Sequence, residues 1–251
     1  MLSAGKQQEI ERSDKLSLDT YKVYRTHPGL RLVFANQNEF IKRQVGIENK
    51  PVRVLDLGCG IGHFISCLYP TNLIVGTDIS FVSLSIARDL NRATSFLCSD
   101  AEFIPFKDSC FDFVIMRDAL HHLCDFTKCL KEIRRVLKGH GKVAIYEPRN
   151  SFCCNLGRRL CRLFGMETET SEGHHIKTKD IEALIKGAGF AISYKDTLEF
   201  IAYPLSLGVI GSPVTKSVFL TKGLIILDRI LSMMCFNKVF GWKVLFIALP
   251  R

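Results

Sequence analysis

Short apolar runs alternate with amphipathic stretches through the middle of the chain. Runs rich in Val, Ile and Leu predict strands buried on both faces near 52–57, 73–77, 94–98, 111–116 and 142–147. Apolar residues at helical spacing predict helices between and after these strands, near 62–69, 80–91, 126–138 and 178–187. Such an alternation is typical of an α/β fold, with a doubly wound, mostly parallel sheet covered by helices on both faces.

A glycine-rich turn follows the first of these strands, in the stretch VRVLDLGCGIGHF. Asp56 lies near the carboxyl end of the strand, and Gly58, Gly60 and Gly62 follow it at alternate positions. Glycine lacks a Cβ atom, so the backbone N–H groups of such a turn can come close to a ligand at the positive end of the following helix. The next strand ends at Asp78, and an acidic residue at this position of such folds accepts hydrogen bonds from the hydroxyl groups of a ribose. The sequence therefore predicts a cofactor that contains a nucleoside.

Two classes of cofactor compete for this arrangement. A dinucleotide-binding turn has the spacing G-x-G-x-x-G, but here the third of those positions, counted from Gly58, is His63. Asp56 precedes the turn, and its carboxylate would repel a pyrophosphate but suits a ligand that carries an ammonium group. S-adenosylmethionine has such a group, and the pattern therefore favours it over a nicotinamide dinucleotide.

At this point the chain resembles the class I S-adenosylmethionine-dependent methyltransferases, in particular the small-molecule group called type 11. Further segments follow in that family's order, namely FLCSDAEFIPF with Asp100 and Ala101, then FDFVIMRDALHHL, and then EIRRVLKGHGKVAIYEP. The resemblance spans roughly residues 50–150, and DIEALIKGAGF at 180–190 is a fainter match. It implies a Rossmann-like sheet of seven strands, in which 190–203 contains a further strand and 242–249 is the last, antiparallel one.

The resemblance also implies which residues bind S-adenosylmethionine. These residues follow the strands and are expected at one rim of the sheet: Asp56, Gly58, Cys59, Gly60, Gly62, Asp78, Ile79, Asp100, Ala101 and Arg117. Glu147, at the end of the fifth strand, is expected at the same rim.

The remaining segments are expected to surround this cofactor-binding core at 51–150. Residues 1–50 predict an N-terminal helical segment, whose aromatic residues Tyr21, Tyr24 and Phe34 cover either the cofactor pocket or a sheet edge. Within the domain at 51–251, residues 149–177 and 204–238 look like insertions that cap the substrate. The apolar clusters of 204–238 fit either a helical cap, which takes an apolar substrate or rests on a bilayer, or core between the last two strands. No uninterrupted apolar run there reaches the roughly 18–20 residues of a membrane span.

Methyl transfer requires an acceptor atom to be aligned with the sulfonium methyl group while water is excluded. Where the acceptor is a hydroxyl, a general base adds rate, and His122 and Glu147 are the candidates that we select. His121, His174 and His175 are further candidates, and His122 also suits a structural role in its loop. Methyl transfer by this fold needs no metal ion, and we predict none.

The composition of the chain indicates its cellular compartment and the charge of its partners. Of the ten cysteines, five fall within predicted elements or the glycine-rich turn, namely Cys59, Cys67, Cys98, Cys110 and Cys129. Because the polar start of the chain also lacks the apolar core of a signal peptide, we expect reduced thiols and a cytoplasmic location. The net charge of +9 favours an anionic partner, whether nucleic acid, phospholipid or a phosphorylated substrate.

The resulting prediction is transfer of a methyl group to a small metabolite of apolar or lipid-linked character, with contact to a membrane surface as a further expectation. An RNA or protein methyltransferase is the main alternative. Against it, the chain shows no RNA-binding appendage, and MRDAL stands where such enzymes carry an N-P-P-Y-like sequence. A non-catalytic scaffold and a nicotinamide-dependent oxidoreductase are the remaining alternatives.

Overall fold

A computed structural model describes residues 4–92, 94–150, 155, 159, 177–199, 202, 213–233 and 236–251. The helices and strands in chain order are α1 (Ala4–Thr26), α2 (Pro28–Val45), β1 (Arg53–Leu57), η1 (Ile65–Cys67), β2 (Leu73–Asp78), α3 (Phe81–Leu90), β3 (Ser95–Cys98), β4 (Phe111–Arg117), η2 (Leu120–His122), α4 (Phe126–Val136), β5 (Leu137–Pro148), α6 (Thr178–Gly187), β6 (Phe190–Leu198), α8 (Pro213–Lys216), α9 (Val218–Met233), α10 (Phe236–Phe240) and β7 (Lys243–Pro250), where η denotes a short 3-10 helix.

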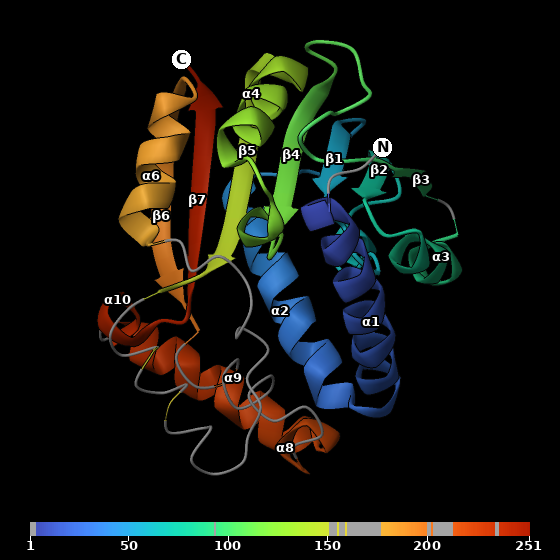
Figure 1. Ribbon diagram of the computed structural model, residues 1–251. Coiled ribbons are helices and arrows are strands. Elements are labelled where there is room, and N and C mark those ends of the chain that lie inside the picture. The colour runs from blue at the N-terminus through green and yellow to red at the C-terminus, as the bar shows by residue number, and fades with distance from the viewer. Residues whose placement is uncertain are drawn as a thin grey trace.

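The strands form one seven-stranded sheet in the order β3-β2-β1-β4-β5-β7-β6 (Figure 1). β7 is antiparallel to both β5 and β6, whereas the other neighbouring strands pair in parallel. This confirms the predicted doubly wound, mostly parallel fold. The chain first builds outward from β1 to β3 and then crosses to β4 on the other side of β1. In such sheets a ligand crevice opens at the carboxyl ends of the two strands where the order reverses.

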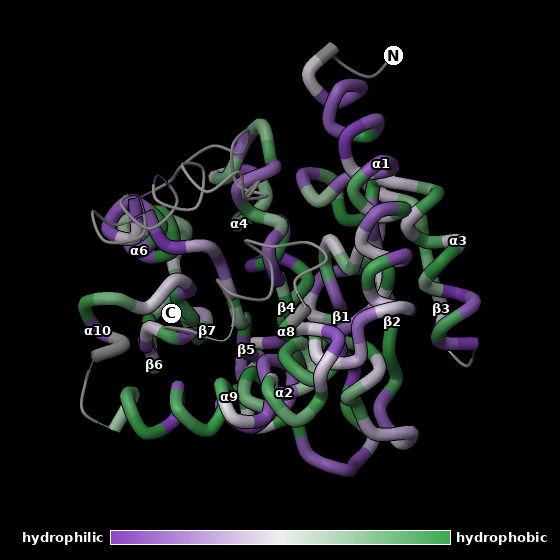
Figure 2. The backbone as a smooth tube through the Cα atoms, turned by 90° about the horizontal axis from the view of Figure 1, so that it is seen from below, coloured by the Kyte–Doolittle hydropathy of each residue, from purple (hydrophilic) through white to green (hydrophobic). Residues whose placement is uncertain are grey.

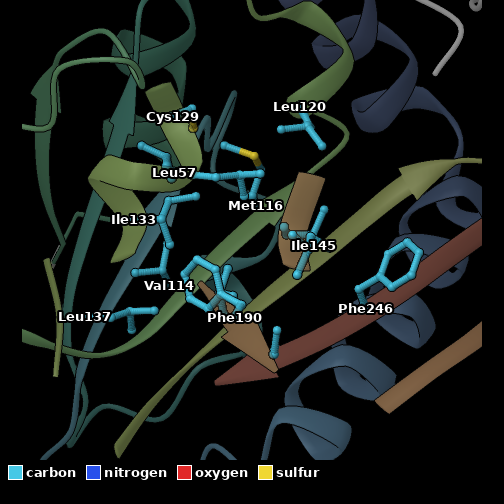
Figure 3. Packing of buried hydrophobic residues seen from close by; sticks show 14 of the residues in the cluster. Leu57, Val114, Met116, Leu120, Cys129, Ile133, Leu137, Ile145, Phe190 and Phe246 are labelled. Carbon is cyan, nitrogen blue, oxygen red and sulfur yellow. The ribbon is translucent and has the colours of Figure 1, made fainter. Parts of the chain in front are cut away.

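Alternate residues of the strands bury themselves on opposite faces of the sheet. On one face, Leu55 and Leu57 belong to a cluster that includes Cys129 and Ile133 of α4 and Ile185 of α6 (Figure 3). On the other face, a second cluster joins Val54 to Ile41 and Val45 of α2, with contributions from β4, β5 and β7. The sheet is therefore a layer between helices, as its apolar strands require.

The helix predicted at 62–69 is absent. Only the three residues of η1 are helical, and the preceding residues form a turn. Gly62 has a φ of 79°, which lies outside the helical region, and Pro70 disfavours helical geometry at Tyr69. Side chains of α2 bind the freed carbonyl groups, because Asn38 donates to the His63 carbonyl at 2.7 Å and Lys42 donates to that of Cys67 at 3.0 Å.

α1 and α2 lie side by side and are joined by His27 alone (Figure 1), and α1 also contacts α3 whereas α2 also contacts α9. Most of the predicted insertion at 149–177, including His174 and His175, lies outside the described residues. So do 204–212 and 234–235 of the second predicted insertion, whose described part forms α8, α9 and the start of α10. In the part of the chain that the structure describes, no helix is long and apolar enough to cross a membrane.

Candidate functional site

A cavity of about 220 Å³ opens at the carboxyl ends of β1, β2 and β4. It brings together most of the residues selected from the sequence, namely Asp56, Gly58, Cys59, Gly60, Asp78, Ile79, Asp100, Ala101, Arg117 and His122. Gly62 and Glu147 do not line it. Residues from distant segments thus meet at one rim of the sheet, where the strand order reverses.

The three glycines of the turn after β1 differ in what surrounds them. Each has a positive φ, which side chains rarely allow. A Cβ atom on Gly58 would lie 2.6 Å from the Cβ atom of Ala119, and one on Gly62 would lie 2.7 Å from Nδ2 of Asn91. A Cβ atom on Gly60 would meet no atom within 4 Å. Gly58 and Gly62 are therefore required by packing, whereas Gly60 leaves open space on the cavity side of the turn.

Asp78 fixes this turn to the end of β2. One oxygen of its carboxylate accepts the N–H group of Gly60 at 2.8 Å, and the other accepts that of Ser80 at 2.9 Å. Ser80 in turn caps α3, because its Oγ accepts the N–H group of Ser83 at 2.9 Å. Burial raises the pKa of Asp78, and the N–H groups of Ser80 and Gly60 offset part of that effect. The carboxylate of Asp78 and the carbonyl group of Thr77, which accepts the N–H groups of Gly58 and Cys59 at 2.8 and 2.9 Å, together hold the turn to the end of β2.

Asp56 is a buried carboxyl group with one unsatisfied oxygen. Its side chain is almost inaccessible, and its Oδ2 atom has no hydrogen-bond partner in the described residues. Burial raises its pKa to about 7, against the lowering effect of the Arg117 charge, and the charge of Asp78 raises it further. A buried acceptor without a partner is costly, so this position of the cavity is suited to a cationic donor.

α1, part of the predicted N-terminal helical segment, forms one wall of the cavity, but through polar residues that were not among those selected from the sequence. Its contribution is largely polar and recurs every three or four residues: Lys6, Glu9, Arg12, Ser13, Leu16, Ser17 and Thr20. Lys6 pairs with Asp100 and, at 2.9 Å, with Glu102. Ser17 lies 2.6 Å from Ser83 of α3, measured between the hydroxyl oxygens. The spacing of these polar residues in the sequence could have indicated this wall, because positions three and four apart lie on one face of a helix.

The predicted aromatic cover forms a second layer behind this wall. Tyr24 and Phe34 pack on the ring of His63, with centroids 4.3 and 4.7 Å away, and His63 lines the cavity. Burial and the charge of Arg117 lower the pKa of His63 to about 3, so its imidazole is neutral at physiological pH. The Arg117 guanidinium lies 5.2 Å from the Phe34 ring centroid. Neither Tyr24 nor Phe34 lines the cavity itself.

The loop after β4 holds the two histidines. His122 lines the cavity, and its Nδ1 atom lies 3.1 Å from Oε1 of Glu9 on α1. The ring of His121 packs on that of His122 with centroids 4.0 Å apart. Asp118 also lines the cavity and contacts Lys243 at the start of β7, and these two residues were not selected from the sequence. The Lys243 and Arg117 charges outweigh burial and hold the pKa of Asp118 below its ordinary value.

Glu147 lies beneath this loop rather than at the cavity. Its Oε1 atom accepts the N–H groups of Ala119 and Leu120 at 3.0 and 2.7 Å, and its Oε2 atom lies 2.6 Å from Nδ1 of His121. Each carboxylate oxygen is thus engaged in holding the loop. Glu147 therefore lies at the carboxyl end of β5, at the rim of the sheet where it was expected, but it does not line the cavity, and a direct catalytic role for it stays a prediction.

The histidines and carboxylates around the cavity are of the residue types that bind metal ions. Within the described ranges, no group of three or more His, Cys, Asp or Glu residues is arranged to hold a metal ion. Nδ1 of His121 is hydrogen-bonded to Glu147, whereas Nδ1 of His122 lies near Glu9 but has no hydrogen-bond partner among the described residues.

Residues 55–145 match a family model described as a methyltransferase domain. An uncharacterized protein of Methanocaldococcus jannaschii is 27% identical over 230 residues, which cover 83% of each chain. Cycloartenol-C-24-methyltransferase of Arabidopsis thaliana is 29% identical over 180 residues, which cover 67% of this chain and 53% of that protein. Demethylmenaquinone methyltransferase of Thermus thermophilus is 33% identical over 119 residues, which cover 43% of this chain and 54% of that protein. The chain thus spans about half the length of these two named relatives.

Solved structures extend the similarity over nearly the whole chain. A Thermotoga maritima protein described as an S-adenosylmethionine-dependent methyltransferase has a TM-score of 0.66 at 19% identity, covering 97% of this chain and 100% of that one. The partner of the Trm112 methyltransferase activator in a Haloferax volcanii complex has a TM-score of 0.64 at 17% identity, with 96% of each chain covered. At these identities the similarity establishes a shared fold.

Proposed function

The chain carries a class I S-adenosylmethionine-dependent methyltransferase domain of the type 11 group, and we propose that it methylates a small acceptor of apolar or lipid-linked character. Two relatives are named as methyltransferases of cycloartenol and of demethylmenaquinone. Apolar side chains also contribute to the cavity, among them Leu16, Ile61, Phe64, Ile79 and Leu123. Both observations support an acceptor that is apolar near the reacting atom.

The single observation that best supports the cofactor assignment is the unpartnered oxygen of Asp56. An ammonium group at that position would satisfy it and would favour its ionised form. S-adenosylmethionine carries an ammonium group, whereas the pyrophosphate of a dinucleotide would add negative charge beside Asp56 and Asp78. The buried carboxyl groups of the cavity therefore fit S-adenosylmethionine better than a dinucleotide.

The other cavity residues are assigned roles by their positions. Asp78, already oriented by two N–H groups, would hold the ribose hydroxyls, and Asp100 with Ala101 would meet the adenine. Gly58, Cys59, Gly60 and Ile79 would offer backbone contacts. Arg117 and Gly62 would support the site without a direct contact to the cofactor. Arg117 places positive charge near Asp56, and Gly62 permits the close approach of Asn91.

When bound, S-adenosylmethionine supplies a methyl carbon that is electrophilic because the attached sulfur is positively charged. The chain aligns the acceptor and excludes water, and α1 suits this role because it covers one side of the cavity. We infer that His122 takes up the proton where the acceptor is a hydroxyl, and its position in the lining of the cavity supports this role. Glu147 acts as a positioning residue, because it holds the loop that presents His122.

Calorimetric titration of the full chain with S-adenosylmethionine, S-adenosylhomocysteine and NAD tests this proposal. We expect micromolar binding of the first two and no binding of NAD. A screen of lipophilic hydroxyl compounds with methyl-labelled cofactor then tests the acceptor class. Binding of NAD alone would overturn the cofactor assignment, and faster labelling of RNA or protein than of lipophilic compounds would overturn the acceptor class.

A further inference from the structure

α9 turns an apolar face outward although one side of it is packed. Its buried residues, Thr221 and Ile225, face the body of the molecule, where Ile225 packs with Val33 of α2. In contrast, Phe219 and Met233 are each 85% exposed. Figures 1 and 2 show α9 at the periphery of the molecule, on the side of the sheet where the parallel strands end. An apolar helix face at this position is unusual for a protein surface in water.

The exposed apolar side chains of α9 form one stripe. At about 100° per residue, the exposed Phe219, Ile226, Ile230 and Met233 fall within an arc of about 60°. Leu220 and Leu227 widen the stripe on one side. The shorter helix α10 contacts α9 and adds Val239 and Phe240 as exposed apolar residues. The apolar surface therefore spans two consecutive helices.

Basic residues border this stripe. Lys222 and Arg229 are seven residues apart on α9, and both project at about 50–70° from the centre of the stripe on the same side, where Arg229 also donates to Oδ1 of Asn36 on α2 at 2.6 Å. Lys238 of α10 is also exposed. Asp228, the one acidic residue in the sequence of α9, is partly buried and accepts the N–H group of Ala202 at 2.9 Å. The border of the apolar stripe is therefore positively charged.

We propose that this surface, formed by the apolar stripe of α9, the exposed residues of α10 and their basic border, docks on a lipid bilayer with anionic head groups. A helix with an apolar stripe and Lys or Arg beside it lies in the bilayer interface, with the cations reaching phosphate groups. The net charge of +9 adds attraction at longer range. Docking would bring the carboxyl ends of the parallel strands toward the membrane surface.

The charges favour a bilayer over a second copy of the chain. A two-fold symmetric dimer through this surface would pair the same patch on both copies, bringing Lys222, Arg229 and Lys238 of each copy near those of the other. Like charges at such an interface oppose association, whereas anionic lipids neutralise them.

Flotation of the full chain with vesicles tests the proposal. One set of vesicles is phosphatidylcholine alone, and the other contains about 30% phosphatidylglycerol, which makes its surface anionic. We expect at least tenfold stronger binding to the anionic vesicles, weakened by raising the salt concentration. The double variant Phe219→Ser with Met233→Ser should lose most of this binding, because both side chains are exposed and their loss leaves the core intact. Lys222→Glu should reduce binding to the anionic vesicles alone.

Phe81→Ser is the matched control, since Phe81 is 63% exposed on α3, away from α9. It should bind vesicles like the unchanged chain. Equal binding by the double variant, or no preference for anionic vesicles, would overturn the proposal. Self-association in sedimentation that the double variant abolishes, without vesicle binding, would instead identify an interface between copies. The flotation readout needs no methyl transfer, so its failure is distinct from failure of the proposed function.

Discussion

Lys6 and Asp100 form an ion pair across the cavity although they are 94 positions apart in the sequence. The same ammonium group donates to Oε2 of Glu102 at 2.9 Å. Burial lowers the pKa of Lys6, but its hydrogen bonds and the charges of Asp100 and Glu102 raise it above the ordinary value overall. The contact therefore holds the first turn of α1 to the end of β3 at neutral pH.

Lys6→Gln should loosen α1 without unfolding the domain. The variant removes the cation between two carboxylates, and we expect amide hydrogens in the first two turns of α1 to exchange at least fivefold faster. S-adenosylmethionine should also associate and dissociate faster, because α1 covers the cavity. Lys22→Gln is the control, since Lys22 pairs with Asp19 on the exposed side of the same helix. Equal exchange in the two variants would contradict the role of Lys6.

Cofactor affinity should depend on pH through Asp56. Its pKa in the folded protein is raised to about 7 from an ordinary value of 3.8. An ammonium ligand favours the carboxylate, so the affinity should rise up to tenfold per pH unit between about pH 5 and pH 7 and then level off. Titrations in buffers with different ionisation enthalpies should detect proton release on binding. In Asp56→Asn, both the pH dependence and the proton release should disappear.

The same pKa predicts an opposite effect on the free protein. Because Asp56 retains its proton to a higher pH when folded than when unfolded, its contribution to the free energy of unfolding falls as pH rises from about 4 to 7. Asp56→Asn should therefore raise the melting temperature of the free protein above pH 7 relative to the unchanged chain, while it weakens cofactor binding. A melting temperature that falls at pH 8 would contradict this prediction.

Asp78→Ala should weaken the binding of S-adenosylmethionine by about 1.5–3 kcal/mol, the usual value of hydrogen bonds to a charged group. The variant also removes the acceptor of the Gly60 and Ser80 N–H groups. Calorimetry well below the melting temperature separates affinity from stability. Asp89→Ala, an exposed change on α3, serves as the control. Unchanged affinity in Asp78→Ala would argue against the proposed ribose contact.

Alanine at Gly58 and at Gly60 should have different consequences. Both positions have a positive φ, which costs about 1–2 kcal/mol for a residue with a Cβ atom. At Gly58 the added carbon also lies 2.6 Å from Ala119, so Gly58→Ala should lower stability by a further 1–3 kcal/mol or so. Gly60→Ala avoids that collision and should chiefly impair cofactor binding. Thermal melting and calorimetry of the two variants measure the contrast.

Glu147→Ala should destabilise the domain by about 2–4 kcal/mol, since it leaves the buried N–H groups of Ala119 and Leu120 without their acceptor. Glu147→Gln retains an oxygen for those groups and should lose less stability. Denaturant unfolding gives the two values. If Glu147→Gln kept its stability but abolished methyl transfer at every pH, Glu147 would be a base rather than a positioning residue.

Local sequence patterns were sufficient to predict the parallel strands of the sheet, whereas its last, antiparallel strand was expected from the family resemblance. The buried strands are continuous apolar runs, and parallel strands at the centre of a sheet require that composition whatever surrounds them. Asp56, Gly58, Gly60 and Asp78 could also be selected in advance, because a turn after a buried strand is placed at the sheet rim by topology. The same reasoning predicted a helix after Gly62 that is longer than the one observed. There, side-chain hydrogen bonds from Asn38 and Lys42 of α2 to backbone carbonyl groups replace the backbone hydrogen bonds of a helix.

The amino-acid sequence by itself determined the order of the parallel strands and the aspartates at their carboxyl ends, because those features depend on local spacing. Only the tertiary structure decided that Lys6 meets Asp100, that Glu147 lies under its loop, and that the stripe of α9 faces outward. Each of these depends on the packing of segments far apart in the chain. A polar helix such as α1 carries a weak apolar signal, and its partners are set by charge and geometry that appear only once the sheet has formed.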